Sequence, residues 1–430
     1  MPSDLSSQAL HSRYNPEQEA ERYINSLELN NEINNTVKCF ILIEPGEGYM
    51  IPVLQKKFPN AKIIALYVNN AEPEKILEKE LPNILSSYIK IIEWRPSMNF
   101  YKDAYVSLLS KTVKYIKKID AEKRTVSAFG VRWVRNFFKN IGNINHVLLY
   151  KETNIPVIIT GSGPSLETAL LDIKKVQDNC LVIAASSSVM ALVNSGIKPD
   201  LVIATDGGAW ALKHLYPFYR YNETANSALA VNLCAALPSQ CQNTPQLILN
   251  DGSLWQSIIL HELKLPSVLI PQRGTVTASA IELALQLTKG NIYLAGLDLG
   301  IKDIRTHVKP YSFDNLLYER AGRFTPIYSE SFIRSRLLKD GGSMDIYADW
   351  FKNQFNIWPK RIFNIENYNE QSADKSKDLF KSIPVNNKEF NVDILYEKDV
   401  RTELELLLGE DVSLFLSHTG TRAKAQRKKV

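Results

Sequence analysis

The sequence lacks the features that mark several protein classes. Its 430 residues contain no run of about 18 uncharged apolar residues, and the polar start "MPSDLSSQALHSRYNPEQEAERYI" has no basic and apolar signal pattern. There is no internal repeat of solenoid period. The cysteines are few and scattered, and the one close pair, Cys234 and Cys241, has no second pair to complete a zinc site. We therefore expect a cytoplasmic protein with free thiols, no membrane span and no metal site.

Excess positive charge is also scarce outside one segment. The formal net charge is +5, and the last nine residues, "RAKAQRKKV", contain five Lys and Arg residues. The rest of the chain is therefore close to neutral. We predict that residues 421–430 form a solvated basic tail and that the protein has no nucleic-acid partner.

What the sequence has is enough apolar material, 45% of its residues, to build two or three α/β domains. Residues 1–35 are expected to be helical or loose. The stretch "VKCFILIEPGEGYMIPVLQKKFPNAKIIALYVNN" then has the order strand, glycine turn, helix, strand, with the turn at Glu44–Gly48. We predict a small nucleotide-fold-like domain over 36–150, with amphipathic bridging helices between about 99 and 145.

The main domain is predicted over residues 151–310. Continuous apolar runs such as "IPVIIT", "LVIAAS" and "LVIATD" alternate there with helical patterns of about ten residues. This alternation is typical of a Rossmann-like parallel sheet covered by helices on both faces. Beyond about residue 310 the sequence pattern changes to helical stretches separated by polar segments. We therefore predict a helical C-terminal domain over 311–420.

Ligands of an open parallel sheet bind beyond the carboxyl ends of its strands, so the turns after the apolar runs are candidate sites. The first is the turn Gly161–Ser165, where the glycines allow close backbone approach, Pro164 suits a first helical turn, and free amides and hydroxyls favour a phosphate. No Lys-Ser/Thr pair follows as in a Walker loop, and Leu166 stands where a third Rossmann glycine would be. A plain capped turn explains this pattern equally well.

Other turns of the same domain carry polar residues. Helix capping explains the serine run, the two strand-end acids and one of the hydroxyls before the next helix as well as a binding site does. His307 is different, because it lies in the polar loop "DIRTHVKPYSFD", where we expect no apolar face for it to pack on and an acid-base role. These further candidates are Ser186, Ser187, Ser188, Asp206, Asp298, Thr275 and Thr277.

The order of these motifs resembles a known family. "GSGPSL", a Ser-rich turn, "GIKPDLVIATD", "GTVTASAIELALQL" and "IYLAGLDLG", followed by a loop His, look like the motility-associated factor (DUF115-type) glycosyltransferases. The resemblance implies a cytoplasmic enzyme related to bacterial sialyltransferases. Such an enzyme would transfer a nonulosonic acid (pseudaminic, legionaminic or sialic-like) from a CMP-linked donor to Ser or Thr of flagellin, without a further cofactor.

The resemblance also implies roles for the candidate residues. The glycine turn would cradle the cytidine phosphate, the serine run would line the same pocket, and the other hydroxyls and acids would surround the donor. His307 would be the base or acid. The substrate-binding set is Gly161, Ser162, Gly163, Pro164, Ser165, Ser186, Ser187, Ser188, Thr275 and Thr277, and the catalytic set is His307, Asp298 and Asp206.

Two other functions stay open. The same glycine turn resembles that of archaeal hydroxymethylpterin pyrophosphokinases, which use ATP and Mg²⁺, but those carry an Asp-x-Asp-Gly cluster where this chain has Thr205-Asp206-Gly207. The N-terminal "IEPGEGYMIPVL" resembles a methyltransferase-like nucleotide fold, yet the next strand ends in Asn69 and Asn70 instead of an acid that would bind a ribose. A degenerate N-terminal half would suit a chaperone-like module that binds flagellin without turnover.

Overall fold

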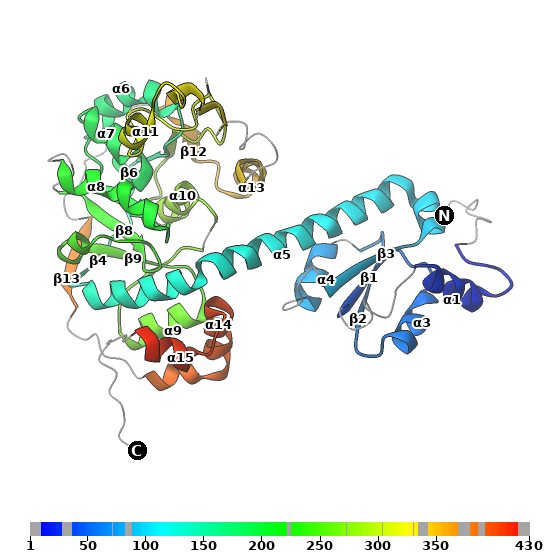
Figure 1. Cartoon of the computed structure of the whole chain (residues 1–430). Coiled ribbons are helices and arrows are strands. Elements are labelled where there is room, and N and C mark those ends of the chain that lie inside the picture. Colours follow the sequence, from blue (N-terminus) through cyan, green and yellow to red (C-terminus); the bar gives the residue numbers. More distant parts are fainter. Residues whose placement is uncertain are drawn as a thin grey trace, which may run out of the picture. The chain divides into compact units, whose positions relative to one another are not determined.

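The computed structural model describes residues 10–27, 37–70, 72–81, 88–221, 224, 226–271, 273–302, 304–329, 331–333, 343–368, 379–385 and 392–419. The chain forms two compact units, residues 1–126 and 127–430 (Figure 1). The predicted basic tail, 421–430, lies outside the described residues.

The first unit is built on a parallel sheet of three strands in the order β2-β1-β3, which agrees with the predicted strand-helix-strand pattern. The central strand is fully buried, and its side chains alternate between two apolar clusters. Phe40 and Leu42 pack against α1 and α3, whereas Ile41 and Ile43 pack against α4 and α5. The elements are β1 (Cys39–Ile43), β2 (Lys62–Leu66), β3 (Ile89–Glu93), α1 (Pro16–Ser26), α3 (Met50–Lys57), α4 (Pro73–Glu80) and α5 (Arg95–Asn143).

Helix α5 belongs to both units by its place in the chain and corresponds to the predicted bridging helices. It is interrupted at Lys102, whose φ of 43° and ψ of −113° are not helical. In the second unit its last turns are anchored by the buried Asn140, whose Nδ2 donates to Leu233 O and Ala235 O, both at 2.8 Å. Two carbonyls just beyond strand β8 are thereby paired.

The second unit is built on a ten-stranded sheet in the order β12-β11-β5-β6-β7-β8-β9-β4-β13, with β10 paired to β9. Among the described strands β13 alone runs antiparallel to its neighbour. The strands are β4 (His146–Tyr150), β5 (Val157–Thr160), β6 (Leu181–Ala185), β7 (Leu201–Ala204), β8 (Ala228–Asn232), β9 (Gln246–Asn250), β10 (Val268–Leu269), β11 (Ile292–Ala295), β12 (Ile362–Asn364) and β13 (Phe380–Pro384).

Helices cover both faces of this sheet, as its continuously apolar strands require. Ile158 and Val182 face one cluster, while Ile159 and Ile183 face the other, which is formed with α10 and α13. The helices of this unit, besides α5, are α6 (Leu166–Val176), α7 (Val189–Asn194), α8 (Leu212–Arg220), α9 (Leu254–Glu262), α10 (Val276–Leu287), α11 (Asp314–Arg320), α13 (Ser343–Ile357), α14 (Lys398–Leu408) and α15 (Val412–Thr419). Short 3₁₀ turns are η2 (Ser186–Ser188), η3 (Ala209–Ala211), η5 (Ser239–Asn243), η6 (Ile365–Asn367) and η7 (Val392–Tyr396).

The region 311–420 does not form the separate helical domain that the sequence predicts. Its strands β12 and β13 extend the sheet, and α14 and α15 bury their apolar side chains in the core cluster of the central strands. Helix α14 also packs on α9 (Figure 1), where Glu403 accepts a hydrogen bond from the backbone N–H of Trp255 at 3.0 Å. The described C-terminal segments are therefore part of the α/β unit.

Both sheets have a point where the strand order reverses. In the second unit the chain builds β5 to β9 outward in one direction and then places β11 on the other side of β5. In the first unit β2 and β3 lie on opposite sides of β1. Crevices for ligands in open parallel sheets occur at such switch points, beyond the carboxyl ends of the strands.

Candidate functional site

The candidate site lies at the switch point of the second unit. The turn Gly161–Ser165 follows β5, and the segment Gly296–Asp298 follows its neighbour β11, so both leave the same edge of the sheet. Ser186 follows β6, which pairs with β5 on the other side. The parallel register therefore brings together three turns that the sequence could place only one at a time.

Hydrogen bonds join the first two turns directly. Gly161 N donates to Ala295 O and Gly163 N to Gly296 O, each at 2.8 Å. A Cβ on Gly161 would lie 2.5 Å from Gly296 O. The two glycines are thus required by the close approach of the β11 segment.

The Asp298 carboxylate occupies the start of helix α6. Its Oδ2 accepts the Ser165 N–H at 3.0 Å and the Ser165 hydroxyl at 2.9 Å. A negative charge at a helix N-terminus is stabilised by the helix dipole and the free N–H groups. The prediction that these amides are free is therefore wrong for Gly163 and Ser165, since the protein supplies its own acceptors.

Several polar groups at this edge do stay available. The Ser162 N–H and hydroxyl, and the hydroxyls of Ser186, Ser187 and Thr277, have no hydrogen-bond partner among the described residues. Thr277 Oγ1 lies beside Gly161, 3.2 Å from the position of a Cβ there. These four side chains form a hydroxyl-lined edge around the switch point.

Three other predicted residues have structural partners. Ser188 is fully buried, and its hydroxyl bonds with Thr160 Oγ1 at 2.8 Å, so it does not reach the surface of the site. Thr275 is the N-cap of α10 and accepts from Ala278 N at 3.1 Å. Pro164 is buried in the first turn before α6.

Asp206 lies beyond the end of β7 and is exposed. Its Oδ1 accepts the Gly208 N–H at 2.7 Å, which closes a local turn before η3. The N-cap of η3 is Gly208, so this contact belongs to the turn and Asp206 is not the cap that the sequence offered as one explanation.

The His307 loop is clamped onto the glycine turn. Val308 is buried, and its N–H donates to Ser162 O at 2.9 Å. Glu167, in the first turn of α6, accepts from Arg305 Nη1 at 2.7 Å and from Lys309 N at 2.9 Å. These contacts hold the loop of His307 at the switch point. The sequence had offered His307 as a candidate only because it lies in a polar loop.

His307 does have an apolar neighbour, contrary to the prediction for its loop. Its ring stacks on Tyr311 with centroids 4.2 Å apart and planes 17° apart, and its Nδ1 lies 2.8 Å from Thr306 Oγ1. Beside it is a pocket whose lining residues are Ile304, Arg305, Thr306, His307, Lys309, Tyr311, Asp314, Leu317 and Ser331.

A second histidine, His214, belongs to the same cluster and was not predicted. The Tyr311 hydroxyl lies 3.4 Å from His214 Nε2, and Phe313 packs edge-on against the His214 ring. Burial lowers the pKa of His214 to about 4, although the Asp206 carboxylate acts in the opposite direction. The imidazole is therefore neutral near pH 7. No local pattern marks His214 in the sequence, because α8 has the amphipathic character of any helix that covers a sheet.

No described group of three or more His, Cys, Asp and Glu side chains is arranged to hold a metal ion. All four cysteines lie in described parts of the chain, where they are buried and form no disulfide bond. Within the described residues, no helix has both the length and the apolar composition needed to cross a membrane.

The fold is that of an α/β protein whose candidate site lies beyond the carboxyl ends of parallel strands, at a point where the strand order reverses and where open sheets of this kind bind ligands. Residues 132–303 match the family model described as 6-hydroxymethylpterin diphosphokinase MptE-like. This match spans β4 to β11 and includes the glycine turn, the hydroxyl edge and both strand-end acids, but ends before His307. The chain thus carries an MptE-like region, in agreement with the DUF115-type resemblance of its motifs.

Two further proteins are similar to this chain. An uncharacterized protein of Treponema pallidum (strain Nichols) is 27% identical over 301 residues, which cover 70% of this chain and 64% of the relative. The match thus spans less than two thirds of that relative. A structure of the MAf glycosyltransferase from Magnetospirillum magneticum AMB-1 matches with a TM-score of 0.47 and 15% identity, over 67% of this chain and 57% of the other.

Proposed function

We propose that this protein is a cytoplasmic glycosyltransferase that moves a nonulosonic acid from a CMP-activated donor to a Ser or Thr hydroxyl of flagellin. The observation that carries the proposal is the clamp between the His307 loop and the glycine turn, in which Val308 N donates to Ser162 O at 2.9 Å. It holds the candidate base His307 near the hydrogen-bond donors at the switch point that have no partner in the described part of the chain. The family resemblance of the motifs supports the choice of substrates.

The reaction needs a base for the acceptor hydroxyl. In the tautomer whose Nδ1–H donates to Thr306, the Nε2 atom of His307 carries the lone pair that takes this proton. The acceptor oxygen then bonds to the anomeric carbon of the sugar while the bond from that carbon to the phosphate oxygen breaks. CMP leaves with the electron pair, and the proton stays on His307.

The leaving phosphate needs hydrogen-bond donors. The Asp298 carboxylate already holds the Ser165 N–H at the start of α6. We therefore assign the phosphate to the Ser162 N–H and to the hydroxyls of Ser162, Ser186 and Thr277. Donors placed where charge develops stabilise a transition state without a metal ion.

The pocket beside His307 suits an acidic sugar. Arg305 and Lys309 both line it, and a nonulosonic acid carries a carboxylate. The Arg305 guanidinium is held by Glu167 in the first turn of α6, so its position is fixed relative to the glycine turn. We expect the sugar carboxylate to lie toward these two cations.

The test is the mass of flagellin after incubation with purified protein and a CMP-nonulosonic acid. An increment of one sugar supports the proposal, and we expect His307→Ala to lower the rate by about 10²-fold or more. His146→Ala, at an exposed position on β4, is the control and should transfer at the wild-type rate. Tight flagellin binding without an increment would overturn the proposal in favour of a binding module.

A second candidate is a diphosphokinase acting on 6-hydroxymethylpterin with ATP and Mg²⁺. The match of residues 132–303 to the MptE-like family model favours it. It is tested in a parallel incubation with ATP, Mg²⁺ and the pterin, followed by mass analysis of the pterin. A diphosphate product there, with unmodified flagellin in the first incubation, would refute the glycosyltransferase.

A further inference from the structure

The first unit has a switch point of its own, between the carboxyl ends of β1 and β3, which is where open parallel sheets form a crevice for ligands. The turn Glu44–Gly48 follows β1, and Trp94 follows β3. Gly46 and Gly48 have φ angles of 62° and 79°, a conformation that favours glycine. This is the place where a nucleotide fold of this kind would receive a ring or a phosphate.

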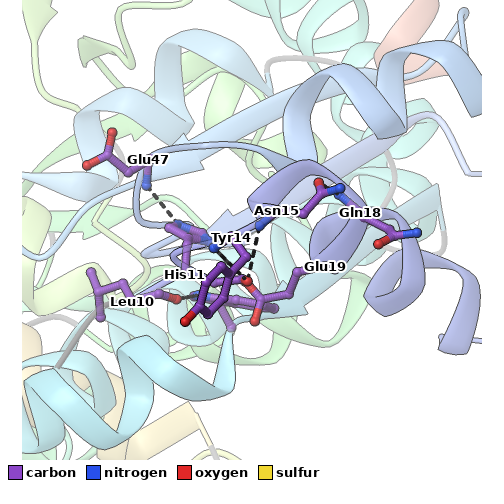
Figure 2. A network of polar contacts seen from close by, with 9 residues as sticks. Leu10, His11, Tyr14, Asn15, Gln18, Glu19 and Glu47 are labelled. Atoms are coloured by element: carbon purple, nitrogen blue, oxygen red, sulfur yellow. Dashed lines mark hydrogen bonds and ion pairs between the residues drawn. The ribbon is translucent and has the colours of Figure 1, made fainter.

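The chain fills this crevice with its own imidazole. Figure 2 shows His11 beneath the turn, with the Glu47 N–H donating to its Nε2 at 3.0 Å. The His11 ring stacks on Trp94 with centroids 5.4 Å apart and planes 20° apart, and Tyr49 meets it edge-on. A Cβ on Gly46 would lie 2.3 Å from Nε2, so the missing side chain makes room for the ring.

Residues 10–14, which we call the plug segment, precede Asn15, the N-cap of helix α1, and are held by a few polar contacts. Ser12 N donates to Glu19 Oε2 at 2.8 Å, and the Trp94 indole N–H donates to Leu10 O at 2.9 Å. Tyr14 of this segment is almost fully exposed. The segment itself contributes no residue to the apolar cluster beneath it, whereas Ala20 and Ile24 of α1 do.

The fit of the plug is incomplete. The His11 side chain is 7% exposed, and its Nδ1 faces Glu19 Oε2 at 3.9 Å, beyond hydrogen-bond distance. This buried nitrogen has no hydrogen-bond partner among the described residues. Because an unsatisfied buried polar atom costs free energy, a ring that satisfied both edges would compete with His11.

We propose that this crevice is a binding site for a planar nitrogen heterocycle of the nucleobase type, closed by His11 of the same chain. The ligand ring would stack on Trp94, accept the Glu47 N–H through a ring nitrogen and direct an N–H or amino group toward Glu19. Binding would displace the plug segment while α1 stays docked through its buried residues.

The ligand class follows from the groups around the slot. Stacking on an aromatic ring and one backbone donor select a flat ring with an acceptor nitrogen. No acidic residue follows β2 in Tyr67–Asn70, and Asn70 Oδ1 is engaged by Tyr67 N at 2.6 Å. The slot therefore recognises the base, and we expect a ribose to add no affinity.

The experiment is calorimetric titration of the full-length protein with imidazole, adenine and adenosine. His11→Ala should bind imidazole and adenine at one shared site per chain, and adenine should bind at least about tenfold more tightly than to wild type, where the plug competes. Adenosine should bind no more tightly than adenine. His261→Ala, at an exposed position on α9, should behave like wild type.

A folded His11→Ala protein that binds neither imidazole nor adenine would overturn the proposal. Ser12→Pro provides a second test if His11→Ala does not fold. It keeps the His11 ring and the Glu19 carboxylate and removes the N–H that Glu19 accepts and the hydroxyl that accepts from Tyr14 N and Asn15 N. We expect this variant to bind adenine several-fold more tightly than wild type. Unchanged adenine binding by a folded Ser12→Pro protein would also refute the plug.

Discussion

Substituting Gly163 by Ala tests whether the contact between the glycine turn and the β11 segment holds the candidate site together. The new Cβ would lie 2.0 Å from Asp298 Oδ2 and 2.7 Å from Gly296 O. Both distances are far below van der Waals contact, and one of the atoms is backbone. The turn and the β11 segment must therefore separate.

The cost follows from what this separation disrupts. Overpacking in a close contact costs about 1–3 kcal/mol. The hydrogen bonds from Ser165 to Asp298 are charge-assisted but lie at the surface, so we add about 1 kcal/mol for their loss. We expect Gly163→Ala to lower the free energy of unfolding by about 2–4 kcal/mol.

The assay is urea denaturation, with the midpoint compared at constant m-value. Gly142→Ala is the matched control, since a Cβ there meets nothing within 4 Å and the position is helical. It should be neutral or stabilising by up to about 1 kcal/mol. In the double variant Gly163→Ala/Asp298→Ala the carboxylate that the new methyl group would meet is absent. Gly163→Ala should therefore lower the free energy of unfolding less in the Asp298→Ala background than in wild type.

Two results would refute this reasoning. One is a Gly163→Ala protein within about 0.5 kcal/mol of wild type, which would mean that the turn relaxes freely. The other is additive costs in the double variant, which would show that Asp298 does not contact the new methyl group.

Three further predictions concern the same unit. Burial lowers the pKa of His214 in the folded protein to about 4, below the usual 6.5. The free energy of unfolding should therefore fall by about 3 kcal/mol as the pH falls from 6.5 toward 4. His214→Phe should flatten that part of the pH–stability curve, and parallel curves for the two proteins would contradict the assignment. Glu167→Gln should lower the rate of sugar transfer to flagellin about tenfold because it loosens the His307 loop. The free energy of unfolding, measured by urea denaturation, should fall by less than about 1 kcal/mol. An unchanged transfer rate would show that the contacts of Glu167 do not contribute to catalysis. Asn140→Ala should cost about 2–3 kcal/mol in the same denaturation assay because two buried carbonyls lose their donor, and a cost below about 0.5 kcal/mol would contradict this.

The sheet of the second unit was largely predictable, because its central strands are buried on both faces and have continuous apolar sequences. Strand ends such as Thr160 and Ala185 then gave the positions of the candidate turns. Strands β12 and β13 were missed because they are short and contain only two apolar residues each, "IFN" and "FKSIP", which is no continuous apolar run of the kind that marks the central strands. Their place in the sheet is decided by backbone pairing with β11 and β4.

The site was predictable only in part. The sequence offered the glycine turn and the loop His as candidates, but the pairing of Asp298 with Ser165 joins positions 133 residues apart and depends on the strand order. His214 was missed for a similar reason, since its contact with Tyr311 spans 97 positions. Local patterns show which residues are polar at strand ends, and the topology decides which of them meet.

The pairing of β4 with β13 has a consequence for synthesis of the chain. Tyr150 pairs with Phe380, so β4 leaves the ribosome long before the strand that covers its free edge. Until then the N–H and C=O groups on that side of the sheet are open to pairing with other chains, which is a known route to aggregation. We expect nascent chains that stop before residue 380 to depend on chaperones more than the complete protein does.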